Sequence, residues 1–217
     1  TATTEIYTLS LHDAFRSTNA YLETNNNGIY NVYTVNGPSI VKFSETLSEG
    51  TMSLYINYNE TSARSVILFG ATGLENLTNS ATNNKNANYY YWYVNASSGG
   101  WILYKVNNGV STNINDQIDG GTTVWQKVYG SAFTRSTYLF EIELEQVDTG
   151  LKITLSVDGH EFLTYTDTEP LTGTQTGYLN NANATSTTFY AISVNATAAE
   201  TAAQNSLNAV ADLPRKD

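Results

Sequence analysis

The sequence predicts an all-β protein, a two-sheet antiparallel jelly-roll sandwich, and three observations lead to this fold class. Apolar and polar residues alternate over many short segments, which is typical of strands that bury one face. Asn-Gly and Asp-Gly pairs separate these segments and favour the tight turns of hairpins. No amphipathic helical pattern lies between the predicted strands, which favours a sandwich or jelly roll.

The first two predicted strands cover residues 51–59 and 64–73. In the first segment, Met52, Leu54 and Ile56 fall on one face, so this strand is expected to be half-buried. The second segment is apolar on both faces, which predicts a central strand of a sheet.

The next two predicted strands cover residues 137–146 and 151–159, and both alternate in the same way. The tripeptide Asp148-Thr149-Gly150 joins them and is the clearest hairpin in the chain. Positive φ angles for further tight turns are expected at four dipeptides, Asn27-Gly28, Asn36-Gly37, Asn108-Gly109 and Asp158-Gly159.

Residues 1–196 are predicted to form a single jelly-roll domain, since a sandwich can reach roughly 200 residues as one unit. Residues 74–86 are rich in Asn and Thr and are expected to be a long surface loop. Residues 197–217 are rich in Ala, and Ala203, Leu207 and Val210 stand at helical spacing. We interpret this last stretch as a short C-terminal helical linker or the start of a following module.

The composition excludes several classes of function. The net charge is −10, so nucleic acid and anionic membranes are expected to be repelled. The chain has no Cys, which excludes disulfides, thiolate zinc sites and a cysteine nucleophile. No apolar run is long enough for membrane insertion. Only 14% of the residues are charged, and a surface rich in Asn, Thr, Ser and Gly is common in exported proteins, so a secreted or cell-surface location is expected.

Three segments carry a family resemblance. Residues 138–159, YLFEIELEQVDTGLKITLSVDG, give an aromatic-rich strand, a Gly turn and an apolar strand that ends in Asp-Gly, and laminin-G-like domains contain a similar hairpin. Residues 87–109 resemble the central strands of the same group, and residues 176–196 resemble its last loop and strand. Together they resemble the concanavalin A-like lectin/glucanase superfamily, and within it the carbohydrate-binding modules of bacterial surface or secreted glycan-degrading proteins.

The resemblance implies non-catalytic carbohydrate binding by one module of a larger protein. Such a module, covalently linked to its neighbours, would hold a secreted or cell-surface protein near a polysaccharide or host glycan. Weak affinity at a single site suffices for this task, because tethering raises the effective concentration of the partner. Two alternatives stay open, a glycoside hydrolase and a structural spacer or protein-binding adhesin domain.

An aromatic run supplies the candidate ligand-binding residues. Alternation places Tyr89, Tyr91 and Tyr93 on one face, which we expect to be exposed, whereas Tyr90 and Trp92 are expected in the core. Sugars stack their C–H faces on such rings and bond their hydroxyls to nearby amides. Ordinary packing of good strand formers would give the same run of tyrosines.

Further candidates would extend this aromatic row. Trp101 and Lys105 share one face of the next strand, opposite Ile102 and Tyr104, and are expected to continue the row with a cationic end. Polar ligand-binding side chains are expected from five amides and one guanidinium, those of Asn57, Asn59, Asn180, Asn181, Asn183 and Arg64.

Three carboxylates carry the enzymatic alternative. Glu141, Glu143 and Glu145 alternate on one strand, so their side chains share a face. The resemblance implies a catalytic role, because some glucanases of the superfamily arrange their acids in this way, and retaining hydrolysis needs two carboxyl groups about 5 Å apart. Glu143 departs from that pattern, which has Asp at the central position. A solvated strand face explains the same three residues.

Two aspartates are the candidate residues for metal binding. Asp116 and Asp119, with nearby loop carbonyls, offer the oxygen ligands that Ca²⁺ prefers, although their spacing matches no specific loop motif. The two histidines, His12 and His160, are far apart and isolated, so neither a zinc site nor a catalytic triad is expected from them.

Overall fold

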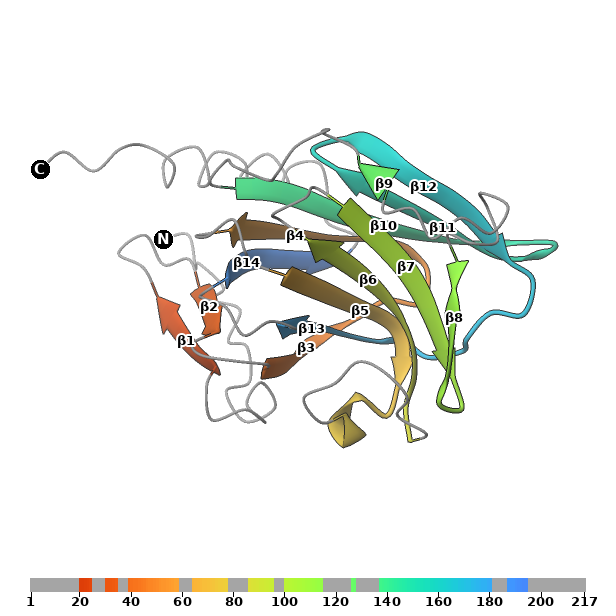
Figure 1. Cartoon of the computed structure of the whole chain (residues 1–217), viewed down its shortest axis with the longest axis horizontal. Helices are drawn as coiled ribbons and strands as arrows, with labels where there is room; N and C mark the ends of the chain where they lie inside the picture. Colours follow the sequence, from red (N-terminus) through yellow and green to blue (C-terminus); the bar gives the residue numbers. More distant parts are fainter. Residues whose placement is uncertain are drawn as a thin grey trace, which may run out of the picture.

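A computed structural model describes residues 20–24, 30–34, 39–58, 64–77, 86–95, 100–114, 126–127, 137–180 and 187–194. These residues form two antiparallel sheets that pack face to face (Figure 1). Sheet A has the order β1 (Ala20–Thr24), β2 (Tyr30–Thr34), β14 (Thr187–Val194), β4 (Gly50–Tyr58), β10 (Thr137–Val147), β11 (Gly150–Val157) and β12 (His160–Asp167). Sheet B has the order β3 (Ser39–Thr46), β13 (Gln175–Asn180), β5 (Arg64–Thr72), β6 (Asn88–Asn95), β7 (Gly100–Asn107) and β8 (Val110–Asn113), and β9 (Gln126–Lys127) pairs with β7.

The three strands predicted from alternation are confirmed as β4, β10 and β11, and the strand predicted from an apolar run is confirmed as β5, which lies inside sheet B. The predicted hairpin between β10 and β11 is confirmed too, since Val147 pairs with Gly150 across a two-residue turn. Asn108 and Asp158 adopt a φ of 50° at the tight turns predicted there. The dipeptides Asn27-Gly28 and Asn36-Gly37 lie outside the described residues.

The core lies between the two sheets because the alternating apolar side chains of both sheets point inward. Along β11, buried and half-buried residues alternate without interruption. Trp92 of sheet B meets Phe140 of sheet A edge to face, with ring centroids 5.1 Å apart. Such aromatic pairs contribute on the order of 1 kcal/mol beyond the area that they bury.

Two further predictions concern loops and helices. The predicted loop begins with a short 3-10 helix, η1 (Leu74–Asn76), held where Leu74 N donates to Gln175 Oε1 at 2.9 Å. The predicted helical linker at residues 197–217 lies outside the described residues. Within the described ranges, no helix has the length and apolar character needed to cross a membrane.

Candidate functional site

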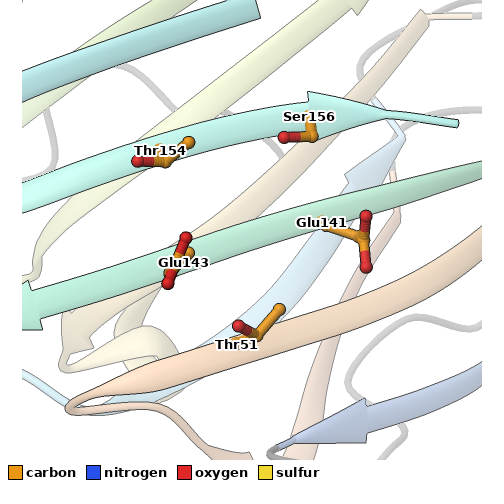
Figure 2. A pocket seen from close by; sticks show the side chains of 5 residues that line it. All are labelled: Thr51, Glu141, Glu143, Thr154 and Ser156. Carbon is orange, nitrogen blue, oxygen red and sulfur yellow. The ribbon is translucent and has the colours of Figure 1, made fainter. Parts of the chain in front are cut away.

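A shallow depression lies on the outer face of sheet A, where three neighbouring strands present polar side chains. It has a volume of about 160 Å³, below the roughly 300–1,000 Å³ typical of ligand pockets, and it is open to solvent on its outer side. Figure 2 shows its lining side chains on β4, β10 and β11, and they are Thr51, Glu141, Glu143, Thr154 and Ser156.

The depression is built from two polar rungs, each with a carboxylate between two hydroxyls. In the first rung, Glu141 pairs with Ser53 of β4 on one side and Ser156 of β11 on the other. Directly paired residues of an antiparallel sheet share a face, and Ser53 Oγ donates to Glu141 Oε1 at 3.4 Å.

The second rung repeats this arrangement one step further along β10. Glu143 pairs with Thr51 and Thr154, and Figure 2 shows its carboxylate between those two side chains. Residues i and i+2 of a strand lie about 6.6–6.8 Å apart, so the two carboxylates can contact adjacent groups of one ligand.

An ion pair lies at one end of the two polar rungs, next to the second rung. Lys152 Nζ lies 2.7 Å from Glu145 Oε2, and the two side chains are 39% and 50% exposed. The hydrogen bond from Lys152 to Glu145 raises the pKa of the lysine. Beside the second rung, Thr164 of β12 donates to Glu161 at 2.8 Å, which extends the polar face to the edge of the sheet.

An aromatic side chain marks the opposite end. Tyr55 is half-buried on β4, two residues after Ser53, and pairs with Leu139 of β10. In the backbone ladder, Tyr190 of β14 stands opposite Tyr55 on its other side. The first rung therefore has an aromatic ring one step away along the same strand.

The predicted tyrosine row is only partly accessible. The alternation is as expected, since Tyr90 and Trp92 lie in the core between the sheets and Tyr89, Tyr91 and Tyr93 lie on the outer face of sheet B. The expected exposure is wrong for two of the three, because Tyr89 is 0% and Tyr91 5% exposed.

A second apolar cluster on this outer face accounts for the burial. It includes Leu74 and Leu77 at η1 together with Ala87, and Tyr91 stacks on Tyr104 with centroids 4.6 Å apart. Burial raises the pKa of Tyr89 to about 12. Tyr93 is half-buried and keeps part of its surface accessible.

Trp101 does not continue the tyrosine row. The register pairs Trp101 with Val94 and Lys105 with Tyr90, so both side chains lie on the inner face of sheet B. Trp101 is buried in the core beside Phe162, with ring centroids 5.8 Å apart. The prediction that Trp101 and Lys105 share a face is confirmed, but the face assigned to them is wrong.

Lys105 holds the two sheets together instead of forming a cationic end of the site. Its Nζ lies 2.7 Å from Asp167 Oδ2 of β12, and the Tyr90 hydroxyl donates to the same oxygen at 2.5 Å. Glu169 N donates to Asp167 Oδ1 at 3.0 Å. Burial alone would raise the pKa of Asp167, but the bonds from Lys105 and Tyr90 outweigh it and lower the pKa.

The other predicted residues that the structure describes are divided between the two sheets. Asn57 is in β4 of sheet A, whereas Arg64 and Asn180 are in β5 and β13 of sheet B. The remaining predicted ligand and metal residues lie outside the described ranges, and they are Asn59, Asn181, Asn183, Asp116 and Asp119. Within the described ranges, no three His, Cys, Asp or Glu side chains are arranged to hold a metal ion. The calcium site at Asp116 and Asp119 stays a prediction.

The predicted site lacked five residues of the depression and its surroundings, although their strands show a pattern that indicates them. They are Thr51, Ser53, Tyr55, Thr154 and Ser156. Hydroxyl residues alternate with apolar ones along both β4 and β11, the strands that flank the glutamates. The polar, outward positions of each alternating strand therefore indicate these residues.

Comparisons with known proteins concern the fold. No protein-family model and no curated protein sequence matches the chain. The carbohydrate binding module CBM66 from Bacillus subtilis aligns with a TM-score of 0.52 at 16% identity, over 80% of this chain and 90% of that one. A Bacillus subtilis protein of unknown function with a galectin-like fold aligns with a TM-score of 0.53 at 11% identity, over 83% and 92%. The chain thus shares its two-sheet fold with these two proteins, which confirms the antiparallel sandwich that the sequence predicts.

Proposed function

We propose that this protein binds carbohydrate without cleaving it, and that the outer face of sheet A is the binding surface. The observation that carries the proposal is the pair of polar rungs beside Tyr55. Sugar hydroxyls both donate and accept, so a carboxylate flanked by hydroxyls offers them partners of both kinds. A tyrosine ring at the end of the rungs offers a surface for the apolar side of a sugar.

The openness of the site favours binding over catalysis. Glu143 is exposed and Glu141 half-buried in a depression that does not enclose a ligand. A glycoside hydrolase raises the pKa of its acid by keeping that group away from water. Two or three stacking and hydrogen-bond contacts at an open site correspond to a Kd on the order of 10 µM to 1 mM.

Several further properties belong to the same proposal. The protein is inferred to work outside the cell or on its surface as one module of a larger bacterial protein. Its low proportion of charged residues and its composition rich in Asn, Thr, Ser and Gly support this location. The fold likeness to a carbohydrate binding module supports the sugar ligand.

A glycan and polysaccharide screen with the chain, followed by calorimetric titration of the best ligand, tests the proposal. Tyr55→Ala should weaken binding about fivefold, since a stacked ring contributes on the order of 1 kcal/mol. Tyr93→Ala is the matched control, because it makes the same change on the outer face of sheet B. Loss of binding in Tyr93→Ala alone would move the site to the surface predicted from the sequence.

The hydrolase remains a second candidate because Glu141 and Glu143 line the same depression. We expect no release of reducing sugar from any ligand found in the screen. Reducing-sugar release that disappears in Glu141→Gln or Glu143→Gln, but persists in Asp148→Asn at the exposed hairpin turn, would establish the enzyme instead.

A further inference from the structure

The binding face proposed above is strongly negative. Among the described residues of β10, β11 and β12, it carries four carboxylates and one ammonium group, those of Glu141, Glu143, Glu145, Glu161 and Lys152. The ammonium group is bound to Glu145 at one end of the row. No ion pair within the described residues joins Glu141 or Glu143 to a cation.

The two central carboxylates therefore remain as acceptors in the depression. Their neighbours in the ladder are hydroxyls, and a hydroxyl can satisfy part of a carboxylate's hydrogen bonding without neutralising its charge. Ser53 is one such donor to Glu141, at 3.4 Å. A ligand that brings a positive donor would gain a charge-assisted hydrogen bond, which is about twice as strong as a neutral one.

The same carboxylates act against an anionic ligand. A sulfate or uronic acid group in the depression would lie within a few ångströms of both Glu141 and Glu143, and like charges at that distance repel. The ligand would also displace the water that solvates these carboxylates, so the repulsion would be less screened than in bulk solution.

The remaining lining favours a sugar chain over a bare cation as the ligand. The hydroxyls of Thr51, Thr154 and Ser156 flank the carboxylates on both sides, and Tyr55 adds an aromatic surface. A bare cation has no apolar face to place on the Tyr55 ring and no hydroxyls to bond with the threonines and serines. A ring that carries both hydroxyls and an ammonium group uses all of them.

We propose that the outer face of sheet A selects glycans by charge. Chains with free amino groups, such as those of deacetylated amino sugars, bind most tightly, neutral chains bind less tightly, and anionic chains are rejected. This selectivity rests on the proposed carbohydrate-binding function and adds the ligand class to it. Glu141 and Glu143 are the specificity-determining residues.

Titration with three oligomers that share length and linkage tests the inference. The oligomers are built from glucosamine, glucose and glucuronic acid, and the pH is kept low enough to protonate the amine. At low ionic strength the glucosamine oligomer should bind about tenfold more tightly than the glucose oligomer, and the glucuronic acid oligomer at least tenfold more weakly. Added salt should reduce both differences, because it screens exposed charges.

A matched pair of variants separates the site from the overall charge of −10. Glu143→Gln and Asp148→Asn each remove one negative charge, the first in the depression and the second at an exposed turn. Glu143→Gln should remove most of the preference for glucosamine, and Asp148→Asn should leave it unchanged.

The outcomes also separate this inference from the proposed function. Equal affinities for the three oligomers would overturn charge selection and leave carbohydrate binding intact. Equal losses of preference in the two variants would also overturn it, since general attraction to an acidic protein would then explain the order. Absence of binding to all three oligomers would overturn the inference as well, whereas the wider glycan screen decides the proposed function.

Discussion

Two ion pairs with the same chemistry lie in different surroundings. Lys105 and Asp167 are 2.7 Å apart with side chains 14% and 5% exposed, whereas Lys152 and Glu145 are equally close but much more exposed. An exposed pair contributes about 0–1 kcal/mol because water competes for both ions. Removing one partner of a buried pair costs about 3–5 kcal/mol, because the other charge is left without a partner.

Asp167→Asn and Glu145→Gln compare the two surroundings directly. At neutral pH we expect Asp167→Asn to lower the free energy of unfolding by about 3 kcal/mol and Glu145→Gln to leave it nearly unchanged. Urea denaturation of both variants measures the difference. Similar losses in the two variants would show that the buried network does not hold the sheets together.

The effect of Asp167→Asn should depend on pH. The pKa of Asp167 in the folded protein lies below its ordinary value of 3.8, so the folded state stabilises the ionised form. That contribution is present above pH 3.8 and disappears as the pH falls through the lower, folded-state pKa. Repeating the denaturation in acid should therefore show a smaller difference between Asp167→Asn and the parent than at neutral pH.

Single strands illustrate what local sequence specifies. The alternation in β4, β10 and β11 is visible within each segment, which is why their spans and their inward residues could be predicted. The face of the sheet on which Trp101 lies could not be predicted in this way, because it depends on how β6 and β7 pair. A shift of one residue in that register would move Trp101 and Lys105 to the other face. The burial of Tyr89 and Tyr91 likewise depends on η1 and Ala87, which are separate segments.

Gly70 is a point of close contact between β5 and β6. Its φ is +56°, and a Cβ atom there would lie 2.9 Å from Tyr90 Cδ2. The Tyr90 ring stacks on Phe69 at 5.3 Å and bonds to Asp167, so it has little freedom to move aside. This glycine combines a left-handed backbone with a crowded surrounding.

Gly70→Ala and Gly159→Ala separate these two effects. Gly159 has a φ of +75° with nothing within 4 Å of a Cβ position, so alanine there should cost only the backbone strain, about 1–2 kcal/mol. Gly70→Ala adds the steric contact and should cost about 2–4 kcal/mol. Chemical denaturation measures both, and equal costs would mean that Tyr90 adjusts without loss.

At the largest scale, the two sheets share one core in the part of the chain that the structure describes. Side chains from both sheets meet in it, including Met52, Leu54 and Phe140 from sheet A and Phe69 and Trp92 from sheet B. The buried bonds of Asp167 to Lys105 and Tyr90 add polar links between the same sheets. Neither sheet can separate from the other without exposing that core to water.

The shared core leads to an expectation for unfolding. Far-UV circular dichroism follows the strands, and the buried core residues Trp92 and Trp101 contribute two of the three tryptophans to the fluorescence, so the two signals should give coincident denaturation curves. A fluorescence transition that precedes the loss of strand signal would show that the sheets separate before they unfold.

The uninterrupted alternation of β11 has a consequence for how this scaffold can be diversified. Its inward residues pack in the core between the sheets. Its outward residues, among them Thr154 and Ser156, line the depression and do not pack in that core. Exchange of the outward set alone could therefore retarget the surface to other ligands while the melting behaviour stays nearly constant. In a directed-evolution library, the positions of β4, β10 and β11 that line the depression would be randomised together, and the inward positions of the same strands would be held fixed.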